Sequence, residues 1–153
     1  MSKTVITYGT FDMFHIGHLK LLRRLSELGD RLIVAVSTDE FNSLKGKKTL
    51  IPYEQRAAIV EAIDCVDLVI PENSWEQKKA DVTDYSVDIF AIGDDWKGKF
   101  DFLEEHCEVI YMPRTKNIST TELKRSLKKF LSISQDDLRK AFEVLELLRK
   151  DLE

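Results

Sequence analysis

Short runs of β-branched and apolar residues alternate along the chain with segments of helical periodicity. The runs that predict strands are residues 4–8, 32–37, 66–70, 89–92 and 109–112, and the segments that predict helices are residues 18–28, 52–62, 75–85 and 120–130. Apolar strands linked by helices are typical of a parallel sheet covered on both faces. We therefore expect an α/β fold with a parallel five-stranded sheet flanked by helices. In such sheets ligands bind beyond the carboxyl ends of the strands, where the strand order reverses.

Residues with strong turn and capping preferences mark several helix ends. Gly29 follows the first helix as a C-terminal stop, and Pro52 suits the first turn of the second helix. Ser74 and Gln77 have the spacing of a capping box for the third helix.

The last segment differs from the rest of the chain. Residues 135–152 predict an extra C-terminal helix whose apolar residues form a narrow stripe along a charged surface: Leu138, Phe142, Leu145, Leu148 and Leu152. Residues 132–135 mark the boundary, so we expect a catalytic domain over 1–131 and an amphipathic helical extension over 132–153. We predict that this extension packs or associates and does not contribute to a site.

Charge and cysteine content exclude several classes of protein. A net charge of −4 over 153 residues gives no basic field, so we expect no nucleic-acid partner. Apolar runs of membrane-spanning length and a signal-peptide pattern are absent, and we expect no membrane partner. Cys65 and Cys107 lack CxxC spacing, which fits reduced, buried thiols in a cytoplasmic protein.

The motif His15-Ile16-Gly17-His18 lies where the first predicted strand gives way to the first predicted helix. The first amides of a helix lack intrahelical partners and suit an anion, and Gly17 removes a Cβ that would keep a phosphate from the backbone. Two imidazoles there can stabilise charge that grows during phosphoryl transfer. The alternatives are surface or capping histidines, or a metal pair, although no third ligand of obvious spacing follows.

Two further loops follow predicted strands. Gly9-Thr10-Phe11-Asp12 comes directly after the first strand, where backbone amides can approach a phosphate. Lys45-Gly46-Lys47-Lys48 lies after the second strand, and the alternatives for it are a solvated basic loop or a lid over anionic substrates.

The loops after the fourth and fifth predicted strands also carry polar groups. Gly93-Asp94-Asp95-Trp96 is either a plain turn or a place where a carboxylate accepts a base amino group or organises a divalent ion. The stretch from Arg114 to Thr121 combines an arginine with hydroxyls at a helix start, where Ser119 and Glu122 form a capping box. The chain has no GxxxxGK[ST] sequence, so it is not a Walker-type ATPase.

Taken together, the sequences GTFDMFHIGH and RTKNISTT resemble the nucleotidyltransferase superfamily with the His-x-Gly-His motif. STDEFN, YEQR, WEQKK and GDDWKGKFD narrow the resemblance to the glycerol-3-phosphate cytidylyltransferase family, over about residues 3 to 127. The resemblance implies a Rossmann-like fold, a dimer and a divalent cation, usually Mg²⁺, whose ligands it leaves open.

The resemblance also implies roles for individual residues. The catalytic group would be His15, His18, Lys47 and Arg114. The residues expected to bind CTP are Gly9, Thr10, Phe11, His15, Gly17, His18, Gly93, Asp95, Arg114, Thr115, Ile118, Ser119, Thr120 and Thr121. Those expected to bind glycerol 3-phosphate are Asp12, Lys45, Trp75 and Lys78. One position departs from the family, which places an arginine before its third strand where this chain has Asp64.

The expected reaction is transfer of CMP from CTP to sn-glycerol 3-phosphate, with CDP-glycerol and pyrophosphate as products for teichoic acid or capsular polymer synthesis. The nucleophile is already ionised, so catalysis reduces to positioning and charge stabilisation. The alternatives are an ethanolamine-phosphate cytidylyltransferase, a sugar-phosphate adenylyltransferase, or a catalytically silent nucleotide-binding module.

Overall fold

The computed structural model describes residues 2–114 and 120–152. Its strands are β1 (Thr4–Gly9), β2 (Arg31–Ser37), β3 (Leu68–Glu72), β4 (Ile89–Gly93) and β5 (Glu108–Met112). Its α-helices are α1 (Ile16–Ser26), α2 (Asp39–Leu44), α3 (Tyr53–Glu61), α4 (Gln77–Asp84), α5 (Thr120–Leu131) and α6 (Gln135–Leu152). Short 3₁₀ helices η1 (Asp94–Trp96) and η2 (Asp101–Glu105) follow β4.

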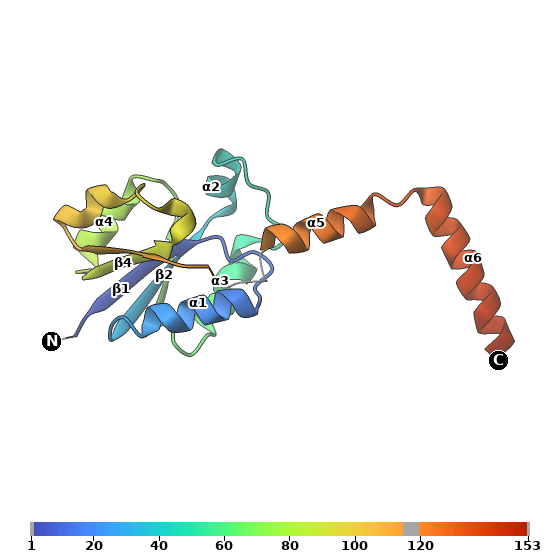
Figure 1. The fold of residues 1–153 in the computed structure, drawn as a ribbon, viewed down its shortest axis with the longest axis horizontal. Coiled ribbons are helices and arrows are strands. Elements are labelled where there is room, and N and C mark those ends of the chain that lie inside the picture. Colours follow the sequence, from blue (N-terminus) through green and yellow to red (C-terminus); the bar gives the residue numbers. More distant parts are fainter. Residues whose placement is uncertain (1, 115–119, 153) are drawn as a thin grey trace. The chain divides into compact units, whose positions relative to one another are not determined.

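The strands form one parallel sheet in the order β3-β2-β1-β4-β5 (Figure 1). The predicted parallel five-stranded sheet is therefore confirmed. From β1 the chain moves outward through β2 and β3, then returns to the other side of β1 for β4 and β5. The strand order thus reverses between β1 and β4. Gly9 pairs in register with Val36, and Gly93 with Met112, so the carboxyl ends of these strands lie at one edge of the sheet.

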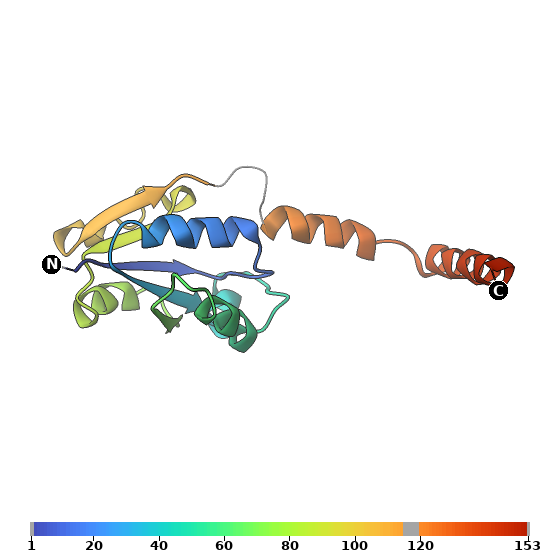
Figure 2. The same ribbon diagram turned by 90° about the horizontal axis from the view of Figure 1, so that it is seen from below.

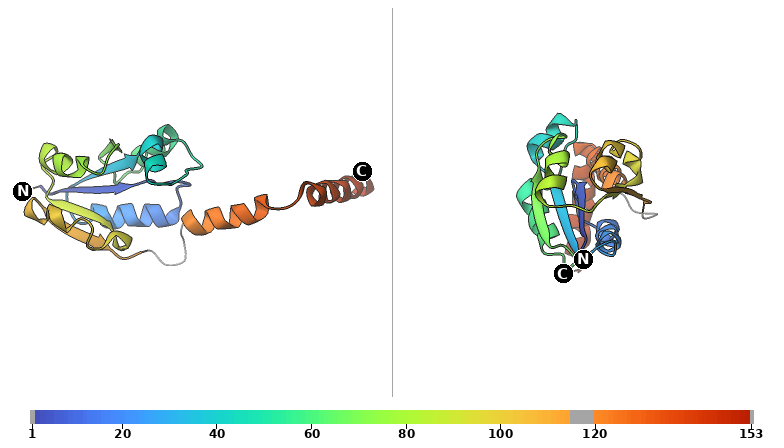
Figure 3. Two further views of the ribbon diagram at one scale, coloured as in Figure 1. Left: turned by 90° about the horizontal axis from the view of Figure 1, so that it is seen from above. Right: turned by 90° about the vertical axis from the view of Figure 1, so that its left-hand side faces the viewer.

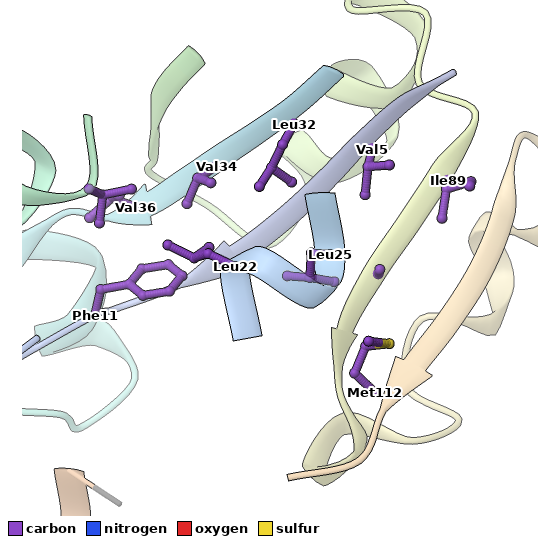
Figure 4. Close-up of a cluster of buried hydrophobic side chains, with 11 residues drawn as sticks. Val5, Phe11, Leu22, Leu25, Leu32, Val34, Val36, Ile89 and Met112 are labelled. Carbon is purple, nitrogen blue, oxygen red and sulfur yellow. The ribbon is translucent and has the colours of Figure 1, made fainter. Parts of the chain in front are cut away.

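Helices cover the sheet on both faces. Leu22 and Leu25 of α1 pack against one face (Figure 4), and Val60 of α3 belongs to the same cluster. Val82 of α4 and Leu103 of η2 belong to the cluster on the other face. Accordingly, α1 and α4 lie on opposite sides of β1 both in Figure 2 and in the right-hand view of Figure 3, which is perpendicular to it. The helices therefore cover the two faces, and the connecting loops lie at the edge formed by the carboxyl ends of the strands.

Some local predictions need correction. Pro52 is the N-cap of α3 and not part of its first turn, and helix α2 lies in the segment predicted as loop after the second strand. Gly29 does not end α1, which stops at Ser26. A Cβ on Gly29 would lie 2.7 Å from the carbonyl oxygen of Lys3, so this glycine allows a close backbone approach. The capping box before α4 is present, because Ser74 and Gln77 exchange hydrogen bonds of 3.0 and 3.2 Å.

The cysteines also differ from the prediction in their burial. Cys65 and Cys107 are free thiols that are only partly buried, each just before a strand. Burial raises the pKa of both thiols above the ordinary value.

The chain divides into two compact units, Met1–Ile118 and Ser119–Glu153. The second contains α5 and α6, and α6 spans the residues predicted for the last helix. Ser134 begins α6 by accepting the amide of Asp137 at 3.1 Å. Side chains of its stripe are exposed, for example Leu145 and Leu152. The predicted domain boundary at 131/132 stays a prediction. Among the helices of residues 2–114 and 120–152, we find none whose length and apolarity would let it cross a membrane.

Candidate active site

The loop between β1 and α1 turns sharply at residues with unusual backbone angles. Phe11 and Met13 have φ angles of 53° and 50°, a left-handed region that residues with a Cβ seldom occupy. A Cβ on Gly9 would lie 2.7 Å from the Phe11 ring, so this position requires glycine for the ring to pack as it does. Such conformations persist only where the surroundings hold them, and they concentrate at functional sites.

His15 and His18 form a reciprocal cap at the start of α1. The Nδ1 atom of His15 accepts the amide of Gly17 at 3.0 Å, and the Nδ1 atom of His18 accepts the amide of His15 at 3.2 Å. Their rings stack with centroids 4.0 Å apart. The expectation that the first amides of α1 are open to an anion is therefore wrong at Gly17, whose amide the His15 ring occupies. Because both Nδ1 atoms accept, we assign the ring hydrogens to the two Nε2 atoms.

Burial keeps these imidazoles neutral. It lowers the pKa of His18 to about 4, with a smaller contribution from the neighbouring His15 and an opposing one from Asp12. Burial also lowers the pKa of His15. Near pH 7 both rings are therefore neutral, and they can offer N–H donors to a phosphate without carrying a positive charge themselves.

Asp12 links the loop after β1 to the segment of residues 45–51, which contains the lysines, by hydrogen bonds. Its carboxylate is buried and accepts the amides of Leu50 and Ile51 at 2.9 and 3.0 Å. These bonds position the loop that carries Lys47. The structure therefore gives Asp12 a positioning role, and its predicted contact with glycerol 3-phosphate stays a prediction.

Arg56 of α3 is a buried residue that was not among the predicted site residues. Its side chain is 1% exposed and donates to the carbonyl oxygens of Thr10 and Ile51 at 2.6 and 2.8 Å. It also pairs with the carboxylate of Asp39 at 2.8 Å. The signal that could have found it is its helical position four residues before Val60, on the same buried face of α3.

A pocket lies at the carboxyl ends of the strands and joins residues from both sides of the strand reversal. It brings together several predicted site residues, namely Gly9, Thr10, Lys45, Lys47, Trp75 and Lys78. It is also lined by residues that were not predicted: Tyr8, Ser37, Glu72, Ile92, Trp96 and Phe100. Cationic and aromatic side chains thus surround one small cavity, as expected for a subsite that takes an anion.

A buried carboxylate lies among the lysines of this pocket. Glu72 pairs with Lys78 at 2.6 Å and lies 3.8 Å from the Nζ atom of Lys45. The Lys78 side chain is only 1% exposed, and its Nζ atom lies 4.6 Å from the ring centroid of Tyr8 and 4.9 Å from that of Trp75. Burial lowers the pKa of Lys45 to about 8, against the opposing attraction of Glu72.

Arg114 forms an ion pair at the exposed end of β4 and β5. Its Nε and Nη2 atoms donate to one oxygen of Asp95 at 3.0 and 2.7 Å. The predicted contact between Asp95 and a base amino group therefore competes with this ion pair. Gly93 ends β4 at the same edge of the sheet.

The other predicted CTP contacts lie elsewhere in the chain. Thr115, Ile118 and Ser119 lie outside the described residues, and Thr120 and Thr121 begin α5 in the second unit.

Asp64 occupies an exposed turn between α3 and β3, before the amino end of that strand. The pocket lies at the carboxyl ends of the strands and is not lined by Asp64. The departure from the family's arginine therefore lies away from the pocket.

In the part of the chain that the structure describes, acidic, histidine and cysteine side chains do not gather into a metal site. Over residues 2–114 and 120–152, no group of three or more of them has the geometry to hold a metal ion. The described residues therefore do not fit a cation held by the protein alone.

Comparisons with known proteins identify clear relatives. The cytidylyltransferase-like family matches residues 6–126. Glycerol-3-phosphate cytidylyltransferase of Bacillus subtilis (strain 168) is 59% identical over 125 residues, which cover 82% of this chain and 97% of that protein. The enzyme of the same name from Staphylococcus aureus (strain NCTC 8325 / PS 47) is 58% identical, covering 82% of this chain and 95% of that protein.

Among solved structures, a lipopolysaccharide core biosynthesis protein from Thermoplasma volcanium GSS1 matches with a TM-score of 0.64 and 26% identity. The match covers 77% of this chain and 100% of that one. This match supports the fold described above.

Proposed function

The chain belongs to the cytidylyltransferase-like family, and we propose that it transfers CMP from CTP to sn-glycerol 3-phosphate, releasing CDP-glycerol and pyrophosphate. The observation that carries this proposal is the high identity to two enzymes of that name, along nearly their whole length. The structure adds a site suited to the reaction, with neutral imidazoles and a lysine-lined pocket at the strand reversal.

In the proposed mechanism, a phosphate oxygen of glycerol 3-phosphate attacks the α-phosphorus of CTP in line, and pyrophosphate leaves from the opposite side. The attacking oxygen already carries charge, so no strong general base is needed. His15 and His18 donate from their Nε2 atoms to oxygens of the α-phosphate, whose negative charge grows in the transition state. As neutral donors they do not have to lose a proton during turnover.

The basic residues then divide between the two substrates. Lys45 and Lys78 hold the acceptor phosphate in the pocket beside Trp75. Lys47, on the exposed side of the same pocket, and Arg114 neutralise the triphosphate. This division places the two anions side by side across the strand reversal.

The resemblance also implies Mg²⁺. Mg²⁺ usually keeps several waters and is held by substrate phosphates with one or two carboxylates. We therefore propose that Mg²⁺ arrives with the triphosphate, where it would supply charge neutralisation.

The pocket favours a neutral alcohol over an amino alcohol. Its carboxylate, Glu72, is already paired with Lys78, so an incoming ammonium group would have to compete for it. Glycerol 3-phosphate brings a dianion, which matches the lysines of the pocket, and hydroxyls that carry no charge. This argues against phosphoethanolamine as the acceptor.

We also propose that the enzyme is a cytoplasmic homodimer, as the family resemblance implies, and that its product serves teichoic acid or capsular polymer synthesis. The molecular mass in solution, measured by light scattering, tests the dimer.

Pyrophosphate release tests the reaction itself. CTP or ATP is combined with glycerol 3-phosphate, phosphoethanolamine or phosphocholine in the presence of Mg²⁺. We expect CTP with glycerol 3-phosphate to be fastest. Faster release from ATP would refute the assignment of the donor, and faster release with phosphoethanolamine would refute that of the acceptor. A lack of release with every pair would indicate a silent nucleotide-binding module.

A further inference from the structure

A carboxylate at the floor of the pocket contacts three polar groups from three parts of the chain. Glu72, the last residue of β3, is 3% exposed. One of its oxygens lies 2.6 Å from the Nζ atom of Lys78, and the other accepts the hydroxyl of Ser37 and lies 3.8 Å from the Nζ atom of Lys45. Lys45 also donates to Ser37 at 3.2 Å. Glu72 therefore fixes both lysines, one directly and one together with Ser37.

The charges around this carboxylate suit a doubly charged anion. Three lysines, Lys45, Lys47 and Lys78, line the pocket together with the single acid Glu72. This leaves a surplus of positive charge for an acceptor phosphate. Among the described residues, the charged groups that act on Lys45 are these two lysines, Glu72 and Arg56.

We infer that Glu72 is a positioning residue for the acceptor, which holds the ammonium groups of Lys45 and Lys78 in place to receive the phosphate of glycerol 3-phosphate. This inference rests on the proposed function and adds a residue to which the family resemblance gave no role. Glu72 acts through the two lysines and does not itself bind the phosphate, because a carboxylate repels that group.

The physical reason lies in the burial of the lysines. Two ammonium groups in one desolvated pocket repel each other, and each loses hydration that the protein must replace. Glu72 replaces hydration at Lys78 and lowers the repulsion between the pair. Without it, Lys45 can turn toward water and is more easily deprotonated, so the acceptor meets fewer fixed donors.

The test compares Glu72→Gln, which keeps the shape and removes the charge, with Glu61→Gln at an exposed position of α3. We expect Glu72→Gln to raise the KM for glycerol 3-phosphate about tenfold at pH 8.5, the scale of one hydrogen bond to a charged group. The KM for CTP should change less than about twofold, since binding of the nucleotide uses other groups. Glu61→Gln should match the wild type.

A pH series separates positioning from simple loss of structure. Glu72 raises the pKa of Lys45, so its removal lowers that pKa further. The acceptor KM of Glu72→Gln should then begin to rise at a lower pH than in the wild type. At pH 6.5, well below the pKa of Lys45 in the wild type, the difference should shrink. A variant that was merely damaged would show the same loss at every pH.

Two further variants keep the inference testable if Glu72→Gln folds poorly. Ser37→Ala should raise the acceptor KM in the same direction without any change of charge. In the double variant Lys78→Met/Glu72→Gln, the loss of binding free energy for the acceptor should be smaller than the sum of the losses in the two single variants, because both act through one contact. Full additivity in this cycle, or an unchanged acceptor KM and pH profile in Glu72→Gln, would overturn the inference.

The failure of the proposed function would look different. In that case the wild type itself would not turn over glycerol 3-phosphate with CTP. The positioning role of Glu72 is then tested by the dissociation constant for inorganic phosphate, measured by calorimetry at pH 6.5 and 8.5. Weaker binding by Glu72→Gln chiefly at pH 8.5 supports the inference, and equal binding by the two proteins refutes it.

Discussion

Replacing Arg56 by methionine should unfold the first unit more readily and loosen the active-site loops. The guanidinium makes three hydrogen bonds of 2.6–2.8 Å, two to carbonyl oxygens of Thr10 and Ile51 and one to Asp39. Asp39 has a side chain 46% exposed and can turn to water, so its loss contributes little. The two partly buried carbonyl oxygens lose their donors, and each unpaired oxygen should destabilise the folded state by about 1–3 kcal/mol. Methionine fills most of the space, so the cavity is small.

The free energy of unfolding should therefore fall by about 2–6 kcal/mol, the sum over the two carbonyls. Urea unfolding followed by tryptophan fluorescence measures it, with Arg23→Met at an exposed position of α1 as the control, expected within about 0.5 kcal/mol of wild type. The kcat/KM for CTP should fall as well, because Arg56 holds the carbonyl of Thr10 in the loop after β1. A loss of stability below about 1 kcal/mol, at an unchanged dependence on urea, would refute the reasoning about the unpaired carbonyls.

Three further outcomes are expected. His18→Ala should lower kcat by roughly 10²–10³, the scale of losing one preorganised donor. The melting temperature should fall modestly, because the amide of His15 loses its acceptor. A variant with near-normal turnover would exclude His18 from the mechanism. The pKa of His18 is about 4 in the folded protein, below the ordinary value of 6.5, so the unfolded chain binds more protons between these values. The wild type should therefore lose stability relative to His18→Ala as the pH falls from 6.5 toward 4, and parallel urea curves for the two proteins across this range would contradict the lowered pKa. Removal of residues 133–153 should leave kcat largely intact. It should change the solubility, the melting temperature or the oligomeric state, since α6 carries exposed apolar residues. Loss of activity at an unchanged mass and melting temperature would show that α6 reaches the site.

Local sequence patterns located the elements of the fold well. Each observed strand begins and ends within two residues of its prediction, because β-branched apolar runs bounded by turn residues suit a buried parallel sheet. The ends of α6 agree with residues 135–152, since Ser134 supplies a cap and the apolar stripe keeps helical spacing. The position of His15 and His18 at the start of the first helix also follows from sequence, because the motif directly follows the first strand and its loop.

The partners of the charged and polar side chains depended on the tertiary structure. Whether His15 would leave the helix amides open or cap them depends on ring orientation, which the motif does not encode. The contacts of Asp12 are also distant in sequence, since its carboxylate accepts amides 38 and 39 residues away.

The burial of charged side chains also depends on the tertiary structure. Arg56 and Lys78 lie on helices, where long charged side chains are usually exposed, but packing against the sheet removes both from water. Their charges are tolerated because the fold brings partners to them: Thr10 lies 46 residues from Arg56, and Glu72 ends the strand before the helix of Lys78. The strands, the helices and the histidine motif can be located from sequence, because they depend on short-range periodicity. The tertiary structure alone decided which charges are buried and what they contact, because desolvation and pairing depend on residues that are distant in the chain.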